Sequence, residues 1–306
     1  MKFADKLIYN SMNKSLKIAR DYFKTYLNLE APIPELRIAA DKMYATLPLA
    51  EDISYETVSV GKLKGEWTRS PEARDSHVLY YIHGGAFLIG SPATHRGEIS
   101  ELGRAGKMKT FALDYRLAPE HPFPQPLEDI FDGYLWLLEQ GYDSKNIIIS
   151  GDSAGGNATI NLMLFARDRG IPMPAGGIAI SPWIDLSQSG ETYKTREGID
   201  PIVSLKAIQA QTAAYLGGAD PTLPLASPIF ADIHGLAPIY IIVGEAEEML
   251  SEALTFTRKA AMAGVHIRLE VWPKMIHNFP LWHAILPEGK DAIKKAGDFI
   301  ISLTTV

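Results

Sequence analysis

The fold is decided by the stretch Ile147-Ile148-Ile149-Ser150-Gly151-Asp152-Ser153-Ala154-Gly155-Gly156. An apolar, β-branched run ends there in a Gly-x-Ser-x-Gly pentapeptide, and the residues from 157 to 167 then carry apolar side chains at helical spacing. The pattern predicts a strand, a sharp turn and a helix, with Ser153 at the apex in a strained conformation that exposes its hydroxyl. The pentapeptide also occurs by chance, so assigning Ser153 as a nucleophile requires partner groups elsewhere in the chain.

Strand patterns and helix patterns alternate through the chain from about residue 53. Two segments, 55–60 and 64–69, flank a turn and are typical of an antiparallel pair. Shorter apolar runs typical of buried strands follow at 78–82, 110–114, 147–149, 178–180, 240–243 and 267–272. Helical patterns lie between and after them, near 95–106, 126–140, 154–169, 251–263 and 288–304. The alternation predicts an α/β fold: an eight-stranded, mostly parallel open sheet with helices on both faces.

Two segments lie outside this alternation. Residues 1 to about 47 favour helices, and apolar residues recur from Leu7 to Leu27 with lysines and arginines between them. We expect this basic amphipathic segment to pack on its own domain rather than on a membrane surface. About sixty residues between the strands at 178–180 and 240–243 contain one helical pattern, 204–216, and no strand. A loop of that length is usually functional, and we expect it to cover the carboxyl ends of the strands as a lid.

The composition is that of a soluble globular protein, since 46% of the 306 residues are hydrophobic and 22% are charged. A formal net charge of −6 argues against nucleic acid as a partner. The chain has no cysteine, which excludes disulfides, thiolate nucleophiles and cysteine-bound metals. No apolar run reaches the roughly 18 residues that span a bilayer, and the first residues do not resemble a secretory signal. We therefore expect a cytoplasmic protein without stable membrane insertion.

Ser153 needs a neighbouring base, because an alcohol is a poor nucleophile near neutral pH. In an open α/β sheet the reacting groups lie beyond the carboxyl ends of the strands, so the base should follow a strand directly. Of the eight histidines, only His83 and His277 satisfy this condition. His277 lies in a loop after the last predicted strand and is the predicted base.

The other histidine, His83, opens a loop that reads His83-Gly84-Gly85-Ala86-Phe87. The backbone N–H groups of Gly84 and Gly85 are predicted to stabilise the negative oxygen of a tetrahedral intermediate, with Ala154 as a third donor. His83 itself is interpreted as an anchor of this loop. The alternative for the two glycines is a plain tight turn.

The base in turn needs a carboxylate that fixes its tautomer and stabilises its charged form. The strand at 240–243 is followed by three glutamates, Glu245, Glu247 and Glu248, and their order leaves the choice among them open. Serine, acid and histidine then follow one another in the chain order of the α/β-hydrolases.

Five ordered motifs resemble the hormone-sensitive lipase family of bacterial esterases, from about residue 50 to the C-terminus. They are the loop 83–87, the run 114–124, the turn 151–157, the segment 181–186 and the loop 275–277. The resemblance implies a single α/β-hydrolase domain over 1–306. It also implies a helical cap from about 1–47 and 187–226, and a catalytic core from about 48–186 and 227–306.

By position, the resemblance assigns Ser153 as nucleophile, His277 as base and Glu247 as acid, with Gly84, Gly85 and Ala154 as oxyanion donors. Glutamate stands where aspartate is commoner in the family, and Ala86 replaces the last glycine of the usual His-Gly-Gly-Gly loop. The implied reaction is hydrolysis of a small-molecule ester with a short to medium acyl chain, without cofactor or metal. A homodimer is plausible for the family.

The pocket and the substrate are less determined by the sequence. Phe87, Trp183 and Phe279 are candidate pocket walls, and core packing is an equal alternative for each. An amidase or peptidase with the same triad, a non-catalytic small-molecule receptor and a lipase at a membrane surface are the competing functions. The receptor role is typical of chains that have lost the base or the acid, and both are available here.

Overall fold

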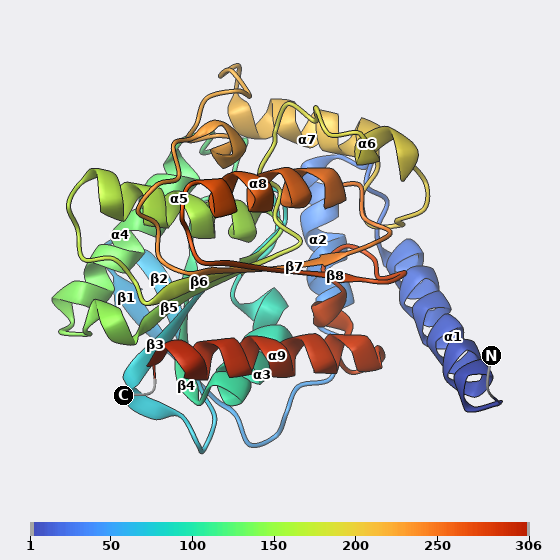
Figure 1. Ribbon diagram of the computed structural model, residues 1–306, viewed down its shortest axis with the longest axis horizontal. Coiled ribbons are helices and arrows are strands. Elements are labelled where there is room, and N and C mark those ends of the chain that lie inside the picture. Colours follow the sequence, from blue (N-terminus) through green and yellow to red (C-terminus); the bar gives the residue numbers. More distant parts are fainter. Residues whose placement is uncertain (1–2, 305–306) are drawn as a thin grey trace.

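The computed structural model describes the backbone of residues 3–304 and the side chains of residues 14–304. Within this range the centre of the fold is one sheet of eight strands, in the order β1-β2-β4-β3-β5-β6-β7-β8 (Figure 1). The strands are β1 (Ser54–Val60), β2 (Leu63–Arg69), β3 (Arg74–Ile82), β4 (Met108–Asp114), β5 (Ile147–Asp152), β6 (Gly176–Ile180), β7 (Ile239–Gly244) and β8 (Ile267–Trp272). β2 pairs antiparallel with β1 and with β4, and the other pairs are parallel, which confirms the predicted sheet.

Helices cover both faces of this sheet (Figure 1). On one face lie α3 (Arg96–Gly106) and α9 (Pro287–Thr304), and on the other lie α4 (Gln125–Glu139), α5 (Ala154–Asp168) and α8 (Leu250–Met262). Successive side chains of a strand point to opposite faces. In β5, Ile148 therefore packs in the cluster of α3 and α9, whereas Ile147 and Ile149 pack in the cluster of α4 and α5. Burial on both faces explains why the central strands are continuous apolar runs.

The two segments outside the strand–helix alternation also form helices. They are α1 (Phe3–Tyr26) and α2 (Ile33–Tyr44) near the N-terminus, and α6 (Thr192–Thr195) and α7 (Leu205–Leu216) in the insertion after β6. Ser204 begins α7 at the predicted position, and its hydroxyl accepts a hydrogen bond from the Ala207 N–H at 3.3 Å. An ion pair of 2.6 Å between Lys206 Nζ and Glu30 Oε2 joins the insertion to the N-terminal segment.

From Leu16 onward, where buried side chains are described, the first helix packs on its own domain, as predicted. Its buried residues are Leu16, Ala19 and Phe23, followed just past its end by Leu27. Ile18, from the same predicted pattern, is instead 45% exposed. The side chains of Leu7, Ile8 and Met12 lie outside the described ones. In the backbone from 3 to 304, no helix combines the length and the apolar character that crossing a membrane requires.

The turn between β5 and α5 brings backbone segments closer together than side chains would permit. A Cβ atom on Gly151 would lie 2.5 Å from the backbone of Gly155. One on Gly155 would lie 1.9 Å from the carbonyl oxygen of Ile82 in β3. Both glycines of the Gly-x-Ser-x-Gly pentapeptide are therefore required by close packing.

Gly155→Ala should destabilise the fold by at least about 3 kcal/mol, because a methyl group has no room against the β3 backbone. Gly97→Ala is the matched control, since Gly97 also lies in a helix and the new methyl group would have its nearest neighbour at 3.4 Å. Alanine is the better helix former, so the control should be neutral or up to about 1 kcal/mol more stable. Urea unfolding measures both variants, and equal stabilities would contradict the crowding at Gly155.

Candidate active site

Ser153 lies on the turn that joins β5 to α5, with φ 54° and ψ −116°. A positive φ is unfavourable for a residue with a side chain, so surrounding contacts must hold it. The Ser153 N–H donates to the Ile180 carbonyl at the end of β6 at 2.8 Å, and the Ser153 carbonyl accepts from the Trp183 N–H at 3.0 Å. The strained apex that the sequence predicts is confirmed.

His277 lies in the loop after β8, and its Nδ1 is 3.0 Å from Glu247 Oε2. Glu247 follows β7 and is fully buried. Its other oxygen, Oε1, accepts hydrogen bonds from the Ser181 hydroxyl at 2.7 Å and from the Gly244 N–H. Because these donors hold Oε1, the carboxylate is kept in one orientation and presents Oε2 to the histidine.

The other two glutamates after β7 have different surroundings. Glu245 is partly exposed and forms an ion pair of 2.8 Å with Arg196. Glu248 is buried, and its carboxylate makes no side-chain hydrogen bond to His277. Burial and the nearby charges of Asp200 and Glu197 raise the pKa of Glu248 to about 7. The contact with His277 therefore distinguishes Glu247 from both neighbours.

Acidic groups surround His277 and control its pKa. Burial alone would lower the pKa of His277, but the hydrogen bond and charge of Glu247 outweigh it. The charges of Asp200 and Asp152 act in the same direction, so the pKa of His277 is raised above its usual value. Asp200 also accepts the His277 backbone N–H, with 2.6 Å between Oδ2 and the nitrogen. The histidine is thus held at both its backbone and its ring.

The loop after β3 offers peptide N–H groups to the site, but not the predicted pair. Gly84 donates its N–H to Asp152 Oδ1 at 2.8 Å, so this group is not available to a substrate. Among the described residues, no acceptor bonds to the N–H groups of Gly85 and Ala86. The N–H of Ala154, in the first turn of α5, has no intrahelical acceptor either.

The reason for this difference is the tight turn after Gly84. The backbone has φ of 107° at Gly85 and 56° at Ala86. The turn is closed by a hydrogen bond of 2.9 Å from the Leu88 N–H to the Gly85 carbonyl, and it is the Gly84 N–H before it that bonds to Asp152. The expected donor Gly84 is therefore corrected to Ala86, beside Gly85 and Ala154.

One pocket of about 100 Å³ brings these groups together, because Ser153, His277, Gly85 and Ala86 all line it. Its remaining walls are mostly apolar, and more than half of them come from the two segments predicted as the cap. They include Phe23, Leu27 and Leu36 from the N-terminal segment, and Ile202, Val203 and Ile208 from the insertion. Segments far apart in the sequence therefore enclose the reacting groups.

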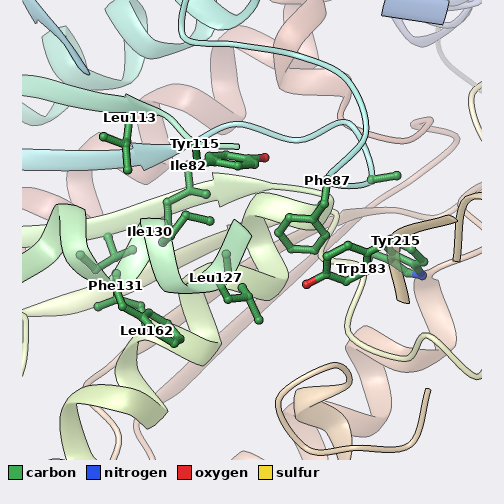
Figure 2. Close-up of a cluster of buried hydrophobic side chains, with 14 of the residues drawn as sticks. Ile82, Phe87, Leu113, Tyr115, Leu127, Ile130, Phe131, Leu162, Trp183 and Tyr215 are labelled. Atoms are coloured by element: carbon green, nitrogen blue, oxygen red, sulfur yellow. The ribbon is translucent and has the colours of Figure 1, made fainter. Parts of the chain in front are cut away.

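The three predicted pocket walls lie in the core instead, and none of them lines this pocket. Phe87 has φ 59° and stacks on Tyr215 with 4.3 Å between ring centres. Figure 2 shows both rings beside Trp183 in a buried cluster. Phe279 packs against Trp272, with 5.4 Å between ring centres. The core-packing alternative is correct for all three residues.

Three residues of the site had no role in the sequence prediction: Ser181, Asp200 and Asn278. Ser181 directly follows β6, so the strand-end rule that identified His277 also applies to it. Asn278 directly follows His277, and its N–H donates to the Ser181 hydroxyl at 3.0 Å. Asp200 lies in the insertion, where neither a strand end nor a motif marks it.

Known proteins resemble the chain in sequence. The model of a protein family described as alpha/beta hydrolase fold matches residues 79–281. An acetyl-hydrolase of Streptomyces hygroscopicus is 39% identical over 249 residues, which cover 81% of this chain and 83% of that protein. An esterase of Acinetobacter venetianus is 35% identical over 269 residues, which cover 88% of each protein.

Solved structures resemble it over nearly its whole length. A crystal structure of an esterase from the bacterial hormone-sensitive lipase family has a TM-score of 0.91 and 39% identity to this chain. The match covers 96% of this chain and 98% of the chain in that structure. The crystal structure of an esterase/lipase from an uncultured bacterium has a TM-score of 0.90 and 40% identity, and the match covers 97% of this chain and 99% of that protein's chain. The chain therefore belongs to the hormone-sensitive lipase family of bacterial carboxylic ester hydrolases, within the α/β-hydrolase fold.

Proposed function

We propose that the chain is a serine carboxylesterase that hydrolyses short- to medium-chain acyl esters through Ser153, His277 and Glu247. The observation that carries this proposal is the hydrogen bond between the buried Glu247 and Nδ1 of His277, which lines the same pocket as the strained Ser153. Because Glu247 occupies Nδ1, the other ring nitrogen, Nε2, is left to accept the hydroxyl proton.

The reaction has two halves that use the same groups. Neutral His277 takes the proton of Ser153 while Oγ attacks the ester carbonyl, and the N–H groups of Gly85, Ala86 and Ala154 stabilise the negative oxygen that forms. Protonated His277, stabilised by Glu247, then gives its proton to the leaving alcohol, and an acyl-serine remains. Water attacks this ester by the same route and releases the carboxylic acid.

The size of the pocket supports short to medium acyl chains. Its volume of about 100 Å³ is small beside the roughly 300–1,000 Å³ of typical ligand pockets. Tyr44, Leu281 and Trp282 line this pocket and also line a second cavity of about 430 Å³, so these side chains separate the two spaces. An acyl chain that extends from Ser153 toward this wall would be limited by it.

The preference for esters over amides is supported by relatives that are named esterase, such as the one from Acinetobacter venetianus. The triad geometry by itself serves both reactions. A cytoplasmic location and a homodimer stay predictions from the sequence.

Ser153→Ala and His277→Ala should each lower kcat on p-nitrophenyl butyrate by at least about 10⁴-fold, because the two residues act as one unit. Glu247→Gln should lower it by about 10³–10⁴-fold, since the amide cannot stabilise the charged histidine. Glu245→Gln is the matched control and should stay close to wild type, because Glu245 pairs with Arg196 instead. Full activity in Glu247→Gln, or loss of activity in Glu245→Gln, would contradict the assignment of Glu247 as the acid.

The pH profile of kcat/KM should report the raised pKa of His277. The base must be neutral, so activity should fall as the pH falls through this pKa, with a midpoint above the ordinary value of about 6.5. In the residual activity of Glu247→Gln, the midpoint should move to lower pH. Burial lowers the pKa of His277, and the charge of Glu247 that opposes this effect is then absent. An unchanged midpoint would argue against the pair of Glu247 and His277.

Tyr44→Ala should extend the range of acyl chains, because it opens the wall between the two cavities. Each methylene that gains a buried place contributes about 0.8 kcal/mol, or about fourfold in kcat/KM. In a p-nitrophenyl ester series from two to sixteen carbons, the optimum should move from the short members to longer ones. Tyr44→Phe keeps the ring and should keep the wild-type optimum; the same optimum in both variants would exclude Tyr44 as a limiting wall.

A further inference from the structure

A second pair of acidic side chains lies beside the oxyanion loop, outside the triad. Asp152 directly precedes Ser153 and is 3% exposed, and Glu98 of α3 is fully buried. The Tyr81 hydroxyl contacts both, at 2.8 Å from Asp152 Oδ1 and 3.1 Å from Glu98 Oε2. Two carboxyl groups this close in a buried place cannot both be ionised without strong repulsion.

The hydrogen bonds show which of the two keeps a proton. A tyrosine hydroxyl has one proton to donate and can accept another. The shorter contact gives the Tyr81 proton to Asp152, so the contact with Glu98 is a hydrogen bond only when Glu98 donates. Burial and the charge of Asp152 both raise the pKa of Glu98 well above its usual value. Burial alone would raise the pKa of Asp152, but the interactions with His95 and Tyr81 outweigh burial, so the pKa of Asp152 is lowered.

Asp152 connects the loops that carry the reacting groups. Its Oδ1 accepts the Gly84 N–H at 2.8 Å, directly before the donors Gly85 and Ala86. Its Oδ2 accepts Asn278 Nδ2 at 2.8 Å, directly after His277.

Protein donors occupy most of the acceptor capacity of this carboxylate. Besides Tyr81, Gly84 and Asn278, His95 Nε2 lies 3.5 Å from Oδ2. About four donors are what two carboxylate oxygens can accept. Asp152 therefore acts on the site mainly through these donors.

We infer that Glu98 and Asp152 form an unequal pair: Glu98 keeps a proton and donates it to Tyr81, while ionised Asp152 positions the oxyanion loop and the His277 loop around Ser153. Asp152 is thus a positioning residue whose negative charge also favours the protonated form of His277. The titratable groups that face Asp152 are Tyr44, Tyr81, His83, His95, Glu98, Tyr115 and His277. The inference rests on the proposed esterase mechanism.

Asp152→Asn and Glu98→Gln test the pair, because both replacements are isosteric and neutral. Asp152→Asn should lower kcat on p-nitrophenyl butyrate by about 10–100-fold with KM little changed, which is less than the roughly 10²–10³-fold of a lost oxyanion donor. The fall of its kcat/KM on the acidic side of the pH profile (the acid limb) should move to lower pH, because the negative charge of Asp152 no longer raises the pKa of His277. Glu98→Gln replaces a group that is already neutral, so kcat should stay within about threefold of wild type and the acid limb should not move.

Infrared difference spectra of the full chain supply a readout that does not depend on turnover. One band of a buried protonated carboxyl group should be present in wild type and in Asp152→Asn and missing from Glu98→Gln, whereas the bands of other buried carboxyl groups with raised pKa, such as Glu248 and Glu252, should remain in all three. A band that disappears in Asp152→Asn instead, or a larger loss of kcat in Glu98→Gln than in Asp152→Asn, would overturn the assignment. Equal pH profiles for wild type and Asp152→Asn would contradict an effect of the Asp152 charge on His277 and leave Asp152 with a structural role alone.

If Asp152→Asn does not fold, Tyr81→Phe carries the kinetic test. It removes the hydroxyl between the two carboxyl groups and should lower kcat by about tenfold or more, since it loosens the carboxylate that holds Gly84. Wild-type kcat in a folded Tyr81→Phe variant would overturn the inference. Failure of the proposed function is distinguishable, because wild type would then hydrolyse no ester, whatever the carboxyl band shows.

Discussion

The close approach of β3, β5 and α5 at Gly151 and Gly155 is the constraint on which the rest of the site depends. Gly155 lies so close to the Ile82 carbonyl that no side chain larger than a hydrogen atom fits between them. The carboxyl ends of the paired strands β3 and β5 and the start of α5 therefore meet at one point. Ser153 comes from the β5 end, and the loop with Gly85 and Ala86 comes from the β3 end. Their separation is therefore set by backbone geometry, which is more exact than placement by long side chains.

The second half of the site follows from the neighbouring strands in the same way. Ser181, Glu247 and His277 follow β6, β7 and β8, and hydrogen bonds join them in sequence across the sheet edge. Asn278 connects this group to Asp152, and Asp152 connects it to the Gly84 N–H. Each reacting group is thus held by a neighbour that is itself held, which is what keeps a buried polar network in one arrangement.

The sequence predicts the parts of this site that depend on strand ends. An apolar run followed by a serine or a histidine indicates a side chain at the sheet edge, and Ser153 and His277 lie there. It does not resolve which of three glutamates contacts the histidine, because one or two residues of loop change the direction of a side chain completely. It also misassigns Gly84, because the orientation of a peptide N–H depends on the φ values of a turn that residue types alone do not specify.

The pocket walls are harder to predict for a different reason. Phe87, Trp183 and Phe279 lie in or beside catalytic motifs, yet an apolar side chain there gains as much by packing into the core as by facing a substrate. The walls instead come from Phe23, Ile202 and other residues of segments that carry no motif. On the proposed mechanism, the edge of the sheet determines the reaction, whereas the pocket that limits the substrate is closed both by cap residues such as Tyr44 and by Leu281 and Trp282, which follow His277. A chain with the same strand ends and a different cap would keep this chemistry and accept a different ester.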